Sequence, residues 1–107
     1  MPATDFTITN LERLKLGNAF MNIMNIEFGS TFEYPQPGGA DNGILVTPAQ
    51  MGVNVVTGLA GIATTGHYAR YRPADERIEI YVSGGAQVAN ANTDLRNETI
   101  VLTVLGT

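Results

Sequence analysis

The chain has 107 residues, 44% of them hydrophobic, with no cysteine and a net charge of −4. This length fits one domain, and the apolar share is too high for a disordered chain. The absence of cysteine excludes disulfides, thiol nucleophiles and thiolate metal sites. Six basic residues against ten acidic ones argue against direct nucleic-acid binding, which needs clustered Lys and Arg.

We expect neither a signal peptide nor a membrane-spanning segment. No apolar run approaches the roughly 20 residues that a spanning helix needs. The first ten residues lack the charged and apolar regions of a signal peptide. We therefore expect a soluble protein made in a cytoplasm, without a membrane partner. Residues 1–5 are expected to form a flexible lead-in, and residues 6–107 a single β domain.

A period of two in the apolar residues marks the first third of the chain. The pattern predicts two strands, about Asp5–Leu16 and Ala19–Phe28, with a bend at Gly17-Asn18. A helix over Leu11–Ile26 is the competing interpretation, because the apolar spacing there fits either period. The residues that disfavour this helix are Gly17, Asn18, Asn22 and Asn25.

The second of these strands is apolar on both faces in its middle. Met21 and Ile23 lie on the face opposite to Met24 and Ile26. Such a pattern is typical of a strand that is covered on both sides. We therefore expect both faces of this strand to be buried.

The longest irregular stretch is Gly29–Gly43, which contains two prolines and the turn dipeptides Gly-Gly and Asn-Gly. A loop of this length that carries aromatic residues usually packs on itself or meets a partner, and both interpretations stay open for Phe32 and Tyr34. The candidate partner contacts are Phe6, Phe32, Tyr34, Pro35 and Pro37.

A single helical turn follows a short strand, Ile44–Val46. Thr47 can cap the turn, with a proline at its first position and Gln50 placed for a capping box. Gly52 ends the turn. A second short apolar strand is expected at Val53–Val56.

The segment His67–Val82 has the pattern of an antiparallel hairpin. Polar and apolar residues alternate on both sides of a loop at Pro73–Glu76. The expected cross-strand pairs are Arg72/Arg77, Arg70/Glu79 and Tyr68/Tyr81. The Arg72/Arg77 pair is unfavourable unless a loop carboxylate, from Asp75 or Glu76, screens it.

The C-terminal segment supplies two further predicted strands. Ala86–Ala89 is a short one, and Thr99–Leu105 is apolar on both faces except for Thr103, which predicts a central position in the sheet. The whole pattern indicates an all-β fold: a small antiparallel β-sandwich or barrel-like domain with at most one short helical turn.

No group of residues has the pattern of an active site, so we expect no enzyme activity, no cofactor and no metal. His67 is the only histidine, and its neighbours Gly66 and Tyr68 offer no catalytic partner. Asp41, Asn42 and Gly43 lack the rest of a calcium loop. The acidic residues of the hairpin and of the segment near Asp94 fit turns and capping better than a hydrolytic pair.

Three ordered segments resemble small virion proteins of tailed phages. The first is Ile26–Ser30 with Pro37-Gly38-Gly39 and Leu45–Val53. The second is Gly66-His67-Tyr68 through Tyr71 to Tyr81. The third is Gln87–Asn90 with Thr93-Asp94-Leu95 and the terminal strand ending in Gly106. Together they cover most of the chain from about Ile8. The loop at Phe32–Gly43 is longer than this pattern has it.

The resemblance implies a structural protein of a phage head, most plausibly a decoration or cement protein on the capsid surface. Its expected partner is the major capsid protein, its expected location is the virion, and a homo-oligomer, with a trimer favoured, is implied. The lead-in over Met1–Thr9 could add a strand to a neighbour. Two other classes remain open: a tail, connector or head–tail joining protein, and a carbohydrate-binding module with Phe32 and Tyr34 as platforms.

Overall fold

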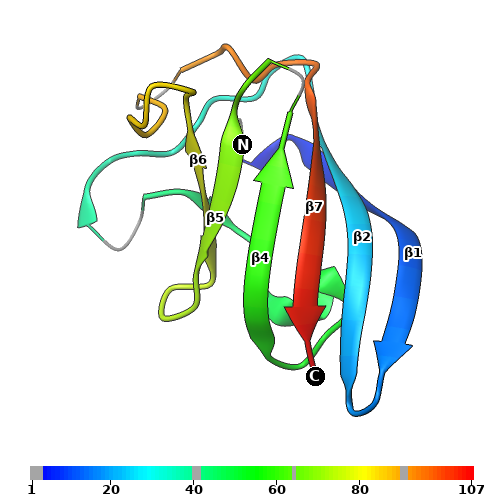
Figure 1. The fold of residues 1–107 in the computed structure, drawn as a ribbon. Coiled ribbons are helices and arrows are strands. Elements are labelled where there is room, and N and C mark those ends of the chain that lie inside the picture. Colours follow the sequence, from blue (N-terminus) through cyan, green and yellow to red (C-terminus); the bar gives the residue numbers. More distant parts are fainter. Residues whose placement is uncertain (1–3, 40–41, 64, 90–91) are drawn as a thin grey trace.

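One curled antiparallel sheet forms the fold, and the all-β prediction is confirmed (Figure 1). The computed structural model describes residues 4–39, 42–63, 65–89 and 92–107. The strand order is β1-β2-β7-β4-β5-β6-β3. The elements are β1 (Phe6–Leu16), β2 (Ala19–Phe28), β3 (Ile44–Leu45), η3 (Pro48–Met51), β4 (Val56–Ile62), β5 (Tyr68–Arg72), β6 (Arg77–Tyr81) and β7 (Thr99–Gly106).

The first two strands form the long hairpin that the sequence predicts, and the competing helix is wrong. Gly17 turns the chain with a φ of 63°. The register runs from Phe6 opposite Phe28 to Leu16 opposite Ala19, and it shifts between Asn10 and Glu12. This irregularity reverses the alternation along β1, so that beyond it Glu12 shares a face with Ile23 of β2.

The β5–β6 hairpin has the predicted register, with Arg70 opposite Glu79. The rings of Tyr68 and Tyr81 stack with their centroids 5.3 Å apart. The like charges of Arg72 and Arg77 are screened, as expected, by Asp75, whose Oδ2 lies 2.7 Å from Arg72 Nε. Glu79 forms its ion pair with Arg72, with Oε2 of Glu79 2.8 Å from Nη1 of Arg72, rather than with Arg70, which lies opposite it in the ladder.

β7 lies between β2 and β4, which confirms its predicted central position. Its inner residues Ile100, Leu102 and Val104 are fully buried, but Val101 on the outer face is 46% exposed. On β2, Met21 and Ile23 are half-buried. The prediction that both faces of β2 are covered is therefore wrong.

The predicted strand at Val53–Val56 is displaced, because β4 begins only at Val56. The preceding residues pair instead with the end of the chain: the Asn54 amide donates to Thr107, and the Thr107 amide donates to Val55. The glycine-containing segment that follows forms the strand. At Ala86–Ala89 the predicted strand is reduced to a single bridge between Tyr81 and Gln87.

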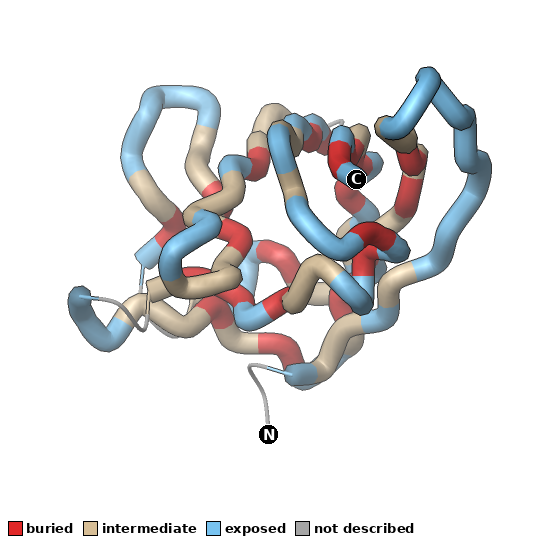
Figure 2. The backbone as a smooth tube through the Cα atoms, turned by 90° about the horizontal axis from the view of Figure 1, so that it is seen from below, coloured by how far each residue is buried: buried red, intermediate tan, exposed pale blue. Residues whose placement is uncertain are grey.

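The core lies on the concave side of the sheet, where the loops cover it. Figure 2 shows buried residues alternating along the strands with partly or fully exposed ones. The capping box between Thr47 and Gln50 forms as predicted, and it starts a 3-10 turn. Asn22, a buried polar residue of β2, donates from Nδ2 to the Met51 carbonyl at 2.8 Å and ties this turn to the sheet.

Replacing Gly61 by alanine should destabilise the sheet, because an added Cβ would lie 2.6 Å from Leu102 Cδ2 and 3.1 Å from Ala69 Cβ. Overpacking of this kind costs about 1–3 kcal/mol. Urea unfolding measures the loss. Gly84→Ala is the control, since its Cβ would have nothing within 4 Å. Equal stability of the two variants would contradict this packing.

Candidate functional site

Two of the five predicted partner contacts are core residues. Phe32 and Tyr34 are fully buried. The Phe32 ring packs against Phe28 with centroids 4.4 Å apart. The Tyr34 hydroxyl accepts a hydrogen bond from the Ile80 amide at 3.0 Å and one from Gln87 Nε2 at 2.6 Å. The core interpretation of these two aromatic residues is therefore the correct one, and the contact interpretation is wrong.

The other three predicted contacts do not gather into one exposed patch. Phe6 is half-buried in β1, opposite Phe28. Pro35 is half-buried, and its carbonyl accepts from the Gly43 amide at 2.7 Å. Pro37 alone of the five is exposed. The long loop is thus a cover for the core that leaves Pro37 at the surface.

His67 and Asn42, two of the polar residues that the sequence singled out, have structural partners. His67 Nδ1 lies 3.6 Å from Glu98 Oε2 and 2.9 Å from Thr65 Oγ1. Asn42 Oδ1 accepts from the Gly38 amide at 2.6 Å and closes a turn. Asp41 lies outside the described residues. Over the described ranges, no group of three His, Asp or Glu residues is arranged to hold a metal ion.

No helix in the described part of the chain is long and apolar enough to cross a membrane.

The feature that sequence reasoning missed is the convex side of the sheet. Residues directly opposite each other in the ladders share a face, so cross-strand rows can be followed over β1, β2, β7 and β4. We call the following residues the outer apolar face: Leu14, Leu16, Met21, Ile23, Ala60, Ile62, Val101, Thr103 and Leu105.

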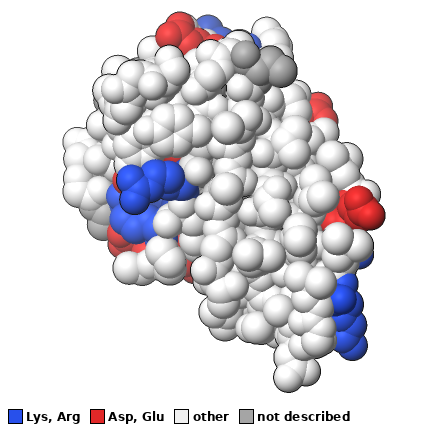
Figure 3. Space-filling view, in the orientation of Figure 1, with Lys and Arg blue, Asp and Glu red and all other residues white. Residues whose placement is uncertain are grey.

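The outer apolar face exposes large side chains. Ile62 is 71% exposed, and Leu14, Leu16 and Leu105 are each at least 40% exposed. In Figure 3 the centre of the face seen in Figure 1 is uncharged, and the charged groups lie toward its margins. Single exposed hydrophobic residues are ordinary, but a contiguous patch surrounded by polar groups marks an interaction site.

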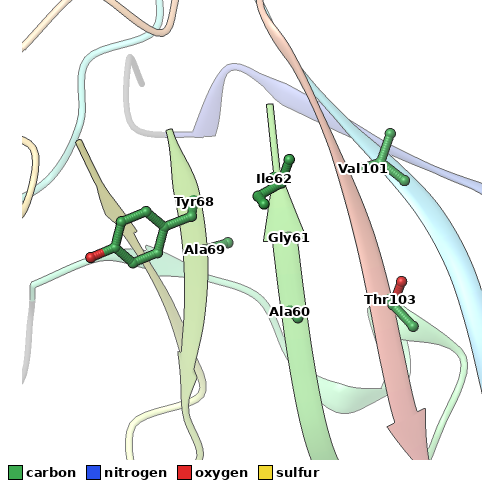
Figure 4. A pocket seen from close by; sticks show the side chains of 7 residues that line it. All are labelled: Ala60, Gly61, Ile62, Tyr68, Ala69, Val101 and Thr103. Atoms are coloured by element: carbon green, nitrogen blue, oxygen red, sulfur yellow. The ribbon is translucent and has the colours of Figure 1, made fainter. Parts of the chain in front are cut away.

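A shallow depression of about 510 Å³ lies within this face. Figure 4 shows its lining: Ala60, Gly61, Ile62, Tyr68, Ala69, Val101 and Thr103. The small residues of β4 leave its floor low, while Tyr68 and Val101 stand on the flanking strands. The lining carries no ionisable group except the Tyr68 phenol, so the depression is suited to an apolar side chain.

The signal for this face was present in the sequence. Met21 and Ile23 on β2, with Val101 and Leu105 on β7, make both faces of two neighbouring strands apolar. That pattern indicates cover on both sides. The described part of this chain buries the inner side alone, which leaves the outer apolar face as a candidate interaction surface.

Comparison with known proteins finds no match: no family model fits the chain, and no curated protein or solved structure is significantly similar to it.

Asp5 joins the start of β1 to the turn that follows β2. Its Oδ2 accepts hydrogen bonds from the Thr31 hydroxyl and from the Thr31 amide, the latter at 2.9 Å. Its carbonyl accepts from the Gly29 amide at 2.8 Å. The Thr31 side chain, followed by the Thr31 amide, lowers the pKa of Asp5 below its ordinary value of 3.8. Asp5 is therefore anchored, and residues from Phe6 onward already pair with β2 and cannot serve as a free added strand.

Replacing Tyr34 by phenylalanine should destabilise the fold by about 1–3 kcal/mol, because the buried Ile80 amide would lose its acceptor. Tyr68→Phe is the matched control, since the Tyr68 hydroxyl has no hydrogen bond in the described structure. Thermal and urea unfolding of both variants measure the difference. Equal losses would show that the Tyr34 hydroxyl is not a structural acceptor.

Replacing Thr31 by valine should raise the pKa of Asp5 toward 3.8. Because the folded pKa is lowered, the contribution of Asp5 to stability is present above its ordinary pKa and is lost as pH falls through the folded value. The stability difference between wild type and Thr31→Val should therefore be smaller in strong acid than at neutral pH. Carboxyl NMR titration of Asp5 and urea unfolding at the two pH values check this, and an unchanged pKa would contradict it.

Proposed function

We propose that this chain is a phage virion structural protein: a capsid decoration or cement protein that binds the head as a homo-oligomer and stabilises contacts between major capsid subunits. The observation that carries the proposal is the outer apolar face, where Ile62 and Val101 are exposed in one cross-strand row and Leu105 is exposed in another. A protein that works by adhesion needs such a surface and needs no catalytic pocket.

The charge of the chain supports an external position. A net charge of −4 disfavours a place against packaged DNA. The resemblance to small phage virion proteins supplies the identity of the shell as partner, and it favours three copies in the oligomer. A carbohydrate-binding module has lost its support, because its platforms Phe32 and Tyr34 are buried.

Two experiments test the proposal: one measures the copy number of this chain in purified virions, and the other adds purified protein back to heads that lack it. We expect the chain to copurify with virions in a fixed ratio to the major capsid protein. Purified protein should rebind to heads from which it has been removed, and it should raise their disruption temperature. Cryo-electron microscopy and quantitative gel analysis measure both effects.

Thr103→Arg is the variant that links this binding to the outer apolar face. It places a charge at the centre of the face and should abolish rebinding, because a buried unpaired charge is costly. Thr93→Arg, in an exposed loop, is the control. Wild-type protein absent from virions, or found in rings at a tail, would contradict the decoration role.

A further inference from the structure

The geometry points to a second copy of this chain as the occupant of the outer apolar face. We propose a two-fold pair in which two outer apolar faces pack against each other, with the symmetry axis parallel to β7. The inference rests on the proposed function only in treating this face as a protein contact. It assigns the face to the contact between copies rather than to the capsid, and it replaces the trimer that the resemblance favours by a two-fold pair.

Shape complementarity supports this orientation. The sheet order is β1-β2-β7-β4-β5, so an axis along the central β7 places β2 of one copy over β4 of the other. Met21 and Ile23 place large side chains on the outer side of β2 and form a ridge. On β4, Gly58 has no side chain and Ala60 a small one, which leaves a groove that ends at the exposed Ile62. Met21 and Gly58 lie in the same cross-strand row, with Leu105 between them. Ile23 and Ala60 lie in another row, with Thr103 between them. The ridge of each copy therefore meets the groove of the other.

Charge complementarity supports the same axis, which places β1 over the partner's β5. Glu12 of β1 lies in the row of Thr103 on the outer side and makes no ion pair with any described residue. Arg70 of β5 is exposed on the same side, and its Cζ lies 5.7 Å from the centroid of the Tyr81 ring. Glu79, opposite Arg70, is already held by Arg72. Glu12 and the partner's Arg70 are therefore free to pair, twice in each dimer.

The other in-plane axis, perpendicular to the strands, fits poorly. It would place β1 over β1 and β2 over β2, so that acidic residues would meet acidic residues and ridge would meet ridge. Pairing through the free edge of β1 is also disfavoured. The edge carries a register shift near Leu11, and a two-fold ladder centred on Leu14 would place Arg13 opposite Lys15.

The size of the face suits a weak but specific dimer. Four strands about 4.8 Å apart, with eight residues at about 3.4 Å each, span a footprint of roughly 500 Å². A pair would bury roughly 1,000 Å², which is near the lower limit of specific protein interfaces. Aligned packing of two sheets is a common architecture.

A charge swap tests the pair. Glu12→Arg and Arg70→Glu should each weaken dimerisation about tenfold or more, since each creates two like-charge contacts. The double variant E12R/R70E should recover wild-type affinity to within about threefold, because opposite charges meet again. Sedimentation equilibrium over a concentration series measures the constants. Lys15→Glu, which changes the net charge as Arg70→Glu does but lies off the outer face, should leave dimerisation unchanged.

Each outcome decides the inference. Recovery in the double variant supports it; additive loss in the double variant, a trimer or a monomer overturns it. Since these residues are exposed, circular dichroism should show wild-type folding in every variant. A wild-type monomer that still loads onto heads overturns the two-fold pair and leaves the decoration role intact. A dimer that does not load onto heads supports the pair and removes the decoration role.

Discussion

A single sheet has two faces, and this chain covers one of them. The loops between β2 and β4, together with the segment before β7, fill the concave side with Phe32, Tyr34, Met51 and Leu95, all fully buried. Within the described residues nothing similar packs on the convex side, where the outer apolar face stays in contact with solvent. Burial of apolar area is the main favourable term in both folding and association. The burial of apolar area that stabilises the core would therefore also favour a partner on the outer apolar face.

The cover of the concave side depends on one buried hydroxyl. Tyr34 joins the long loop to β6: its hydroxyl oxygen accepts from the Ile80 amide and from Nε2 of Gln87, in the segment that follows β6. Burial raises the pKa of Tyr34 above its ordinary value of 10.0, so the hydroxyl stays neutral. Arg96 adds a second tie through its Nε to the Phe32 carbonyl at 2.9 Å. The long loop is thus tied to the β5–β6 hairpin through Tyr34 and to the segment before β7 through Arg96.

Local pattern predicts much of this fold, and its failures have physical causes. The β5–β6 register follows from alternation and turn chemistry within one short segment, and the first hairpin follows in the same way. The predicted position of β4 is wrong because the glycines of this strand have low strand propensity. Its actual position depends on close packing of Gly61 against Leu102 and Ala69, and a local sequence pattern carries no information about such packing. For Phe32 and Tyr34 the sequence left core and surface equally open, since burial of a loop aromatic residue depends on contacts up to 53 residues away.

The candidate site follows the same logic at the level of whole faces. Apolar residues on both sides of β2 and β7 predicted cover on both faces, but the described part of the chain covers only the inner face. A sequence pattern does not say whether a second cover would belong to the same chain. The free edge of β1 carries a register shift and two cations, Arg13 and Lys15, features that discourage strand addition. An edge that resists pairing beside a face that remains apolar directs association through the face. That combination fits the decoration role proposed above, because it would allow docking in one register without open-ended growth of the sheet.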